Sequence, residues 1–441
     1  MAVRMTTRDR ITLALLVSMS LFLFADQRIM AAILKELSHE YGVGKNVLGY
    51  IGSAFTVVGA VTSIIFGFYT DRFSRKKLLI AAVLVGEIPC LLTGFKFFTM
   101  DLQSFIILRI LTGIGIGGIY PISFSLISDY FREEHRATAS AWLGVAWALG
   151  AMAGQSLAGY LTNSFGWRIA FILAAAPNFP LAVFFALYAR EPERGRTERA
   201  LEELIQKGIA YKQRISIRDF GIIFSNRTNL FTFLQGIPGT IPWGILGFFL
   251  IDYFETVHGI TKEQATTLFI ILGAGVLVGQ VLWAMVGERL YAKKPAYMPL
   301  LCGAGVLAGV VPAFVLMNLP VVKDAPASYL ALFYALAFIA GFLVSVPSSN
   351  VKAILMNVNR PEHRGSVFAV FNITDNLGQG FGPAIGGILI SSGYLLTMNF
   401  AIAWWVPCGL LFFLVALTIG RDRAAMQELL RRRADGMARK E

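Results

Sequence analysis

The stretch GFYTDRFSRKK, residues 67–77, places Asp71, Arg72, Arg75, Lys76 and Lys77 between two long apolar runs. The chain around it has 441 residues, of which 56% are hydrophobic and only 15% charged. A soluble protein of this length carries about 25% charged residues. The apolar runs on both sides are close to the roughly 20 residues that a helix needs to cross a bilayer. The composition therefore predicts a multispanning membrane protein with a compact charged loop between two of its spans.

Twelve apolar segments follow one another along the chain, and we expect each to be a transmembrane helix. Helices of this length satisfy all their backbone hydrogen bonds internally, as the apolar part of a bilayer requires. The predicted fold class is therefore an all-α membrane protein. The predicted spans are 11–34, 47–69, 78–98, 104–126, 137–160, 168–189, 228–252, 266–288, 297–317, 328–351, 365–389 and 397–420.

The net charge of +12 is unevenly distributed, because basic residues gather in alternate loops. They precede span 1 and follow spans 2, 4, 6, 8, 10 and 12, whereas the other loops hold few. Cytoplasmic loops are enriched in Lys and Arg, so we expect a multi-pass protein of the cell membrane with both termini in the cytoplasm. The charge then reflects topology, with binding to anionic lipid as a secondary interpretation, and it does not indicate nucleic-acid binding.

The two halves of the chain share a pattern. The tripeptide Glu-His-Arg occurs at 134–136 and again at 362–364, an offset of 228, and glycines recur in the same register, as in Gly150 and Gly378. Such repeats are typical of transporters built from two related bundles. We predict four parts: a six-helix bundle over 1–189, a cytoplasmic linker over 190–227, a second six-helix bundle over 228–420 and a basic cytoplasmic tail over 421–441.

Three motifs resemble those of the major facilitator superfamily, and the resemblance covers almost the whole chain. They are GFYTDRFSRKK between spans 2 and 3, RILTGIGIGG from Arg109 in span 4, and GQGFGPAIGG at 378–387 in span 11. The resemblance implies two pseudo-symmetric six-helix bundles with a substrate path between them. Within the superfamily, ADQRIM in span 1 and SLISDYFREEHRA after span 4 are most similar to bacterial Spinster-like transporters, which are associated with lipid-like solutes.

The charged loop is interpreted through this resemblance as a conformational latch. The resemblance implies that Asp71 caps span 11 and pairs with basic residues of its own loop, holding the two bundles together when the site faces outward. An anion near a helix N-terminus is stabilised by the helix dipole. The alternative is that the basic residues only anchor the topology. The latch residues predicted in this way are Gly67, Asp71, Arg72, Arg75, Lys76 and, at the end of span 4, Asp129.

Few charged residues lie inside spans, and each needs a reason because a charge at the bilayer centre costs about 2.5–3.5 kcal/mol. Asp26 lies about 15 residues into span 1, and Arg109 lies about five residues from the outer edge of the oppositely directed span 4. The two should therefore meet at similar depth. We predict an Asp26–Arg109 pair that acts as a proton switch, with Arg109 also able to hold an anionic substrate. The alternative is a structural ion pair that fixes helix packing.

Further candidates lie in both halves of the chain. In span 11, Asp375 is a second candidate for proton coupling or a polar contact between helices. In span 3, Glu87 is either protonated or paired within one bundle. The Gly/Pro-rich stretch 236–244 of span 7 predicts a bend in that helix. The predicted substrate-binding residues are Arg109, Tyr120, Gln235, Trp243, Asn372 and Asn376.

These features predict a proton-coupled secondary transporter that moves a lipid-like or amphipathic small molecule by alternating access. A small organic anion is the runner-up substrate, and an uncoupled lipid flippase of the same fold is a further alternative. The sequence has no phosphate-binding loop, no nucleophile motif and no histidines at metal-ligand spacing. We therefore expect neither an enzyme nor a metal site, no cofactor beyond the proton gradient, and a monomer whose partners are its substrate, protons and membrane lipids.

Overall fold

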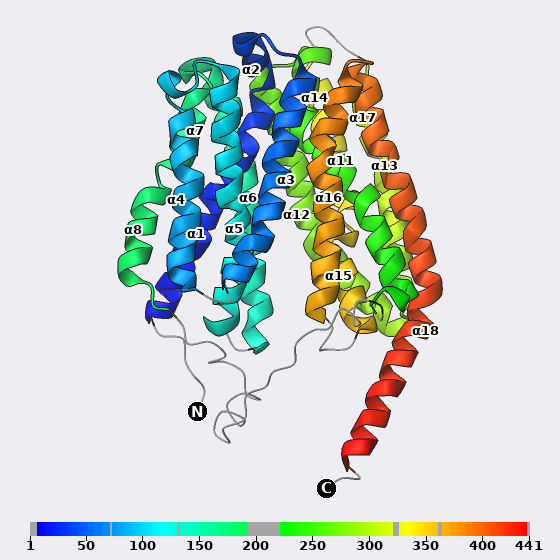
Figure 1. The fold of residues 1–441 in the computed structure, drawn as a ribbon. Coiled ribbons are helices and arrows are strands. Elements are labelled where there is room, and N and C mark those ends of the chain that lie inside the picture. The colour runs from blue at the N-terminus through cyan, green and yellow to red at the C-terminus, as the bar shows by residue number, and fades with distance from the viewer. Residues whose placement is uncertain are drawn as a thin grey trace. The chain divides into compact units, whose positions relative to one another are not determined.

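The computed structural model describes residues 7–70, 73–130, 133–191, 221, 223–320, 326–359 and 364–438. The chain divides into two compact units, Met1–Gln213 and Arg214–Glu441, and the described part of each is a bundle of helices (Figure 1). The described residues contain no β-strand. The predicted linker 190–227 lies mostly outside the described residues.

The first unit contains six spans in the order of the sequence. Helix α2 and the start of α1 lie at opposite ends of this unit (Figure 1). Short helices connect or divide some of the spans. The elements are α1 (Thr7–Ile29), η1 (Met30–Ala32), α2 (Leu34–Tyr41), α3 (Lys45–Thr70), α4 (Arg75–Thr93), η2 (Lys96–Phe98), α5 (Leu102–Tyr130), α6 (Glu133–Phe165), α7 (Arg168–Ala175) and α8 (Asn178–Tyr188).

The second unit repeats this plan. Its last helix, α18, continues beyond the other helices of the unit (Figure 1). The elements are α11 (Arg227–Val257), α12 (Lys262–Lys293), α13 (Tyr297–Asn318), α14 (Ala327–Val344), α15 (Pro347–Val358), α16 (Arg364–Ile390), α17 (Tyr394–Ala403) and α18 (Trp405–Ala438).

All twelve predicted spans coincide with helical segments. In the described part of the chain, nine segments pass a length and hydropathy test for membrane spans; α4, α6 and α16 are the further helices that complete the twelve. Three spans are divided into two helices each: α7 and α8, α14 and α15, and α17 and α18. Span 7 is one continuous helix, since α11 continues through Pro238 and Pro242. The predicted bend at this stretch stays a prediction.

Glycines set the closest helix crossings, and the repeat places them at equivalent positions. Helix α6 packs along α1, and α16 packs along α11 in the same way. A Cβ atom at Gly150 would collide with the Leu21 carbonyl, and one at Gly378 would meet the Ile237 carbonyl 2.6 Å away. Small residues let helix backbones approach closely in membranes. The glycine register seen in the sequence is therefore a helix-packing repeat.

The glycines of RILTGIGIGG bring α5 against two helices at once. A Cβ at Gly113 would lie 2.7 Å from the Phe55 carbonyl of α3, while one at Gly115 would collide with the backbone of Gly86 in α4. The residue after Gly86 is Glu87. This acidic residue of α4 is fully buried in the first unit, where it interacts with Arg109.

Candidate functional site

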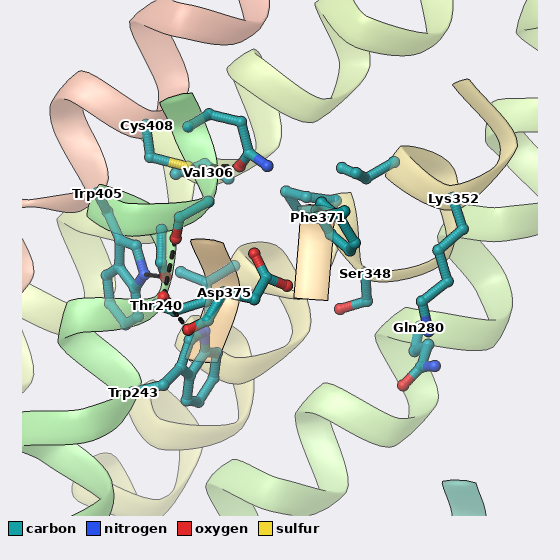
Figure 2. A pocket seen from close by; sticks show the side chains of 16 residues that line it. Thr240, Trp243, Gln280, Val306, Ser348, Lys352, Phe371, Asp375, Trp405 and Cys408 are labelled. Atoms are coloured by element: carbon teal, nitrogen blue, oxygen red, sulfur yellow. Dashed lines mark hydrogen bonds between the residues drawn. The ribbon is translucent and has the colours of Figure 1, made fainter. Parts of the chain in front are cut away.

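A cavity of about 330 Å³ lies inside the second unit (Figure 2). Its described walls come from six spans of that unit, with α11, α15, α16 and α18 contributing most of the polar and aromatic groups. Small-molecule pockets have volumes of about 300–1,000 Å³, so this cavity is at the lower end of the range. Its polar lining residues are Gln235, Thr240, Gln280, Ser348, Lys352 and Asp375.

One cation and one acid line this cavity among the described residues. Lys352, on α15, extends toward Gln280 of α12, and Asp375, on α16, points into the space between the helices (Figure 2). Gly236 makes room for the acid, because a Cβ at that position would lie 2.7 Å from Asp375 Oδ1. The Thr240 hydroxyl donates to the Asp375 backbone carbonyl at 2.8 Å and so joins α11 to α16 at the site.

Two tryptophans form an aromatic wall beside these groups. The rings of Trp243 and Trp405 lie 5.6 Å apart between centroids, inclined at 64°. The Trp405 indole N–H donates to the Gly239 carbonyl at 3.3 Å, which fixes this ring. Deeper in the wall, the Cys408 thiol donates to Gln235 Oε1 at 3.4 Å. The cavity therefore offers flat aromatic surface, amide groups and one ammonium group.

Three of the predicted site residues meet at this cavity: Gln235, Trp243 and Asp375. Asn372 and Asn376 are exposed on the same helix as Asp375, but they do not line the cavity. Their predicted role in substrate binding therefore stays a prediction. Sequence analysis missed Lys352, because the predicted tenth span ended at residue 351. A lysine directly after an apolar run is the signal in the sequence that could have indicated it.

Asp26 and Arg109 form the predicted pair inside the first unit. Arg109 Nη1 donates to Asp26 Oδ1 at 2.8 Å, and the two side chains are 2% and 0% exposed. Arg109 Nη2 also donates to Thr93 at 3.1 Å and to Thr112 at 3.2 Å. The guanidinium lies over the Phe171 ring at 4.6 Å. Arg109 thus faces α4 and α7 within its own unit, and its predicted contact with substrate would require these neighbours to separate.

Tyr120 belongs to an aromatic cluster of the first unit. Its ring lies 4.4 Å from Trp147 and 5.3 Å from Phe24 between centroids, and the residue is 36% exposed. The three cysteines of the chain, at positions 90, 302 and 408, are free and buried. The substrate-binding role of Tyr120 stays a prediction.

The described part of the charged loop is tied to the end of span 6. The Glu191 carboxylate accepts the backbone N–H groups of Arg75 and Lys76 at 2.9 Å each, together with the Ser74 hydroxyl. The Arg75 side chain pairs with the same carboxylate at 3.3 Å. Burial would raise the pKa of Glu191, but these hydrogen bonds outweigh it and lower the pKa below its usual value. Glu191 therefore caps the N-terminus of α4.

The other latch residues are only partly described. Gly67 lies in α3, where a Cβ would be 3.7 Å from Pro121 Cβ, an ordinary contact. Asp71 and Arg72 lie outside the described residues, and so does the side chain of Asp129. The latch therefore stays a prediction, while the Glu191 contact is an additional partner that the sequence analysis missed.

The arrangement of two helical units, with a polar cavity in one and a buried ion pair in the other, can be compared with known proteins. The sequence model of the Major Facilitator Superfamily matches residues 16–322 and 232–436. The chain belongs to this superfamily. It is consequently a multi-pass membrane transporter and not an enzyme, as the motifs predicted.

Individual relatives differ in the solutes that their names give. The chain is 25% identical over 375 residues to a cis,cis-muconate transport protein of Acinetobacter baylyi, with 84% of each chain covered. It is 24% identical over 436 residues to a sphingosine-1-phosphate transporter of Danio rerio, covering 92% of this chain and 84% of the other. A bacterial homologue of the human lysosomal transporter Spinster, solved in an inward-facing conformation, has a TM-score of 0.80 at 18% identity, covering 95% of this chain and 99% of that one. The similarity to this Spinster homologue, at 18% identity, shows that the two chains share a fold.

Proposed function

We propose that this superfamily member is a proton-coupled secondary transporter of a small organic anion, bound in the cavity of the second unit. The observation that carries the proposal is the cavity itself: Lys352, amide groups and two tryptophans line a space of about 330 Å³. An ammonium group supplies a point charge for a carboxylate. The aromatic wall suits a flat, unsaturated carbon skeleton.

The relatives support this substrate class. Names among them include transporters of cis,cis-muconate, of niacin and of sulfoacetate, whose solutes are small organic anions at neutral pH. The runner-up substrate of the sequence analysis therefore becomes our first choice.

Asp375 gives the cavity a means of coupling to protons. As a carboxylate it competes with the substrate for Lys352, because both are anions facing one cation. A proton bound to Asp375 removes this competition and allows the substrate to bind. Substrate and proton then bind together, which favours symport driven by the proton gradient. The basic loops support a topology with both termini in the cytoplasm.

A lipid-like substrate remains the second candidate, since the chain is similar to Spinster proteins. A long acyl chain would need more apolar space than this cavity provides, because its walls carry six polar side chains. A lipid transporter of this fold would use a different surface, and an uncoupled flippase would need no titrating residue.

The test is uptake into proteoliposomes with an internal pH dye, comparing nicotinate, cis,cis-muconate and a lysophospholipid. We expect uptake of a small carboxylate with simultaneous acidification of the lumen, and no competition from the lysophospholipid. Lys352→Gln should raise the Kd for the carboxylate at least tenfold, measured by quenching of tryptophan fluorescence, while Gln280→Glu should weaken it through repulsion.

Two results would contradict the proposal. Transport of the lysophospholipid with no transport of either carboxylate would establish the lipid function. Carboxylate uptake with no proton signal would leave a facilitator, and Asp375 would have no coupling role.

A further inference from the structure

The first unit contains a second acidic residue close to the Asp26–Arg109 pair. Glu87, on α4, is fully buried, and it accepts a short hydrogen bond from the Asn178 side-chain amide of α8. The other amide hydrogen of Asn178 goes to the Met19 carbonyl at 3.2 Å. Glu87 is thus held by a neutral group, whereas Asp26 is held by a cation.

The charges of this cluster do not balance if both acids are ionised. Asp26 and Glu87 both interact with Arg109, which is the cation that faces them among the described residues. Arg109 gives its hydrogen bonds to Asp26 and to two threonines. An ionised carboxylate without its own cation is costly in a buried, low-dielectric interior. One of the two acids therefore has to be neutral, and the one without the ion pair is Glu87.

Two unsatisfied atoms point to the same conclusion. Glu87 Oε2 and Asn178 Oδ1 are both buried, and neither has a hydrogen-bond partner among the described residues. Two oxygens cannot bond to each other without a hydrogen. If Glu87 carries a proton on Oε2, it becomes a donor, and the acid and the amide can form two parallel hydrogen bonds. A single proton then satisfies both atoms at once.

We infer that Glu87 is a proton-binding site of the first unit, neutral in this state and paired as a carboxylic acid with Asn178. Release of the proton to water leaves a carboxylate that competes with Asp26 for Arg109. The Asp26–Arg109 geometry therefore depends on whether Glu87 holds its proton. Only the use of this proton in transport rests on the proposed function; the protonation itself does not.

The groups around Glu87 leave no other described charge to balance it. Helix α1 contributes Asp26, α5 contributes Arg109, and α4 itself contributes the Cys90 thiol, which donates to the Phe171 carbonyl at 3.7 Å. Helix α8 contributes the neutral Asn178. The charged residue of α7, Arg168, is paired with Glu40. Among the described residues no three His, Cys, Asp or Glu side chains are placed to hold a metal ion, so a cation other than a proton is not indicated here.

The direct test is infrared spectroscopy of the purified protein, which needs no substrate. A buried protonated carboxyl group gives a C=O stretch separate from that of carboxylates, and the band shifts on exchange into D₂O. We expect this band in the wild type at neutral pH and its loss in Glu87→Gln. Asp375→Asn is the matched control, because it removes the candidate acid of the other unit and should leave the Glu87 band in place.

Two further variants test the partners. Asn178→Leu removes the amide and should shift the band to higher frequency, since a free acid carbonyl is less polarised. Asp26→Asn leaves Glu87 as the carboxyl group facing Arg109, so Glu87 should ionise and the band should weaken. If Asp26→Asn does not fold, the comparison of wild type with Glu87→Gln still decides the protonation.

The inference is overturned if the wild type shows no protonated-acid band, or if the band survives unchanged in Glu87→Gln. A band that is unchanged in folded Asp26→Asn would overturn the competition for Arg109. Because none of these measurements involves uptake, they separate a failure of this inference from a failure of the transport proposal.

Discussion

The polar cluster of the first unit and the cavity of the second unit use similar residues in opposite surroundings. Asp26 and Arg109 are in contact at 2.8 Å and almost fully buried, whereas Asp375 and Lys352 line a space of about 330 Å³. In the first case the cation is already occupied by protein groups. In the second case the cavity leaves room for a ligand between helices. An acidic and a basic residue within spans are thus not sufficient to indicate a binding site. A binding site also needs an open cavity beside these residues.

The largest expected effect comes from removing Arg109. Arg109→Met would leave Asp26 buried without its cation, and breaking a buried ion pair in this way costs about 3–5 kcal/mol. We expect a large drop in the thermal unfolding midpoint in detergent, measured by light scattering or intrinsic fluorescence.

The matched change in the other unit is Lys352→Met. Lys352 is exposed and borders the cavity, so its loss should change the free energy of unfolding by no more than about 0.5 kcal/mol. Similar destabilisation by both variants would contradict the distinction between a buried pair already satisfied by protein groups and a site open to a ligand.

The second prediction concerns glycines that hold each region in place. A Cβ at Gly115 would collide with the backbone of Gly86, and backbone cannot move aside without separating α4 and α5. Gly115→Ala should therefore destabilise the fold by about 1–3 kcal/mol, as overpacking does. It should also disturb the Glu87–Asn178 contact, because Glu87 follows this crossing.

Gly236→Ala is the corresponding change at the cavity. There the added Cβ meets a side-chain oxygen of Asp375 at 2.7 Å, and a side chain can turn away. We expect little loss of stability but an altered pH dependence of substrate binding, measured by fluorescence quenching between pH 5 and pH 8. Equal destabilisation by both alanines would show that the cavity wall is as rigid as the helix crossing.

The sequence predicted the elements that depend on local composition or on a repeat. Twelve apolar runs gave the twelve spans, and the offset of 228 between Gly150 and Gly378 identified the repeated helix crossing. Counting helix rise predicted that Asp26 and Arg109 meet, and the structure confirms the contact. These features could be predicted because a helix rises by a fixed length per residue, so that distances along the sequence convert directly into positions along the helices.

The contacts that the sequence did not indicate join residues that no motif or helical spacing connects. Asn178 is a neutral residue 91 positions from Glu87, so nothing in either segment indicates the other. Glu191 lies in a run of charged residues after span 6, and its choice of the α4 N-terminus follows from tertiary packing. Lys352 was missed by one residue at the end of a predicted span, which is within the ordinary error of a boundary.

The smallest expected effect lies at the surface of the first unit, where Glu191 caps α4. Hydrogen bonds from the loop lower the pKa of Glu191, so the carboxylate stabilises the folded state at pH values above its unfolded pKa of about 4.3. The stabilisation is lost as the pH falls through the lowered folded pKa. Because the side chain is 36% exposed, solvent limits this contribution to about 1 kcal/mol or less.

Glu191→Gln should therefore lower the unfolding midpoint slightly at pH 7, and the difference from the wild type should vanish in acid. Glu288→Gln, at an exposed glutamate of α12, is the matched control for the removal of one surface carboxylate. A constant difference at all pH values would mean that Glu191 acts through packing rather than through its charge. The Glu191 cap would then stabilise the fold by packing, as the buried contacts of the first unit do. Its exposure to solvent would not be the reason why its contribution to stability is small.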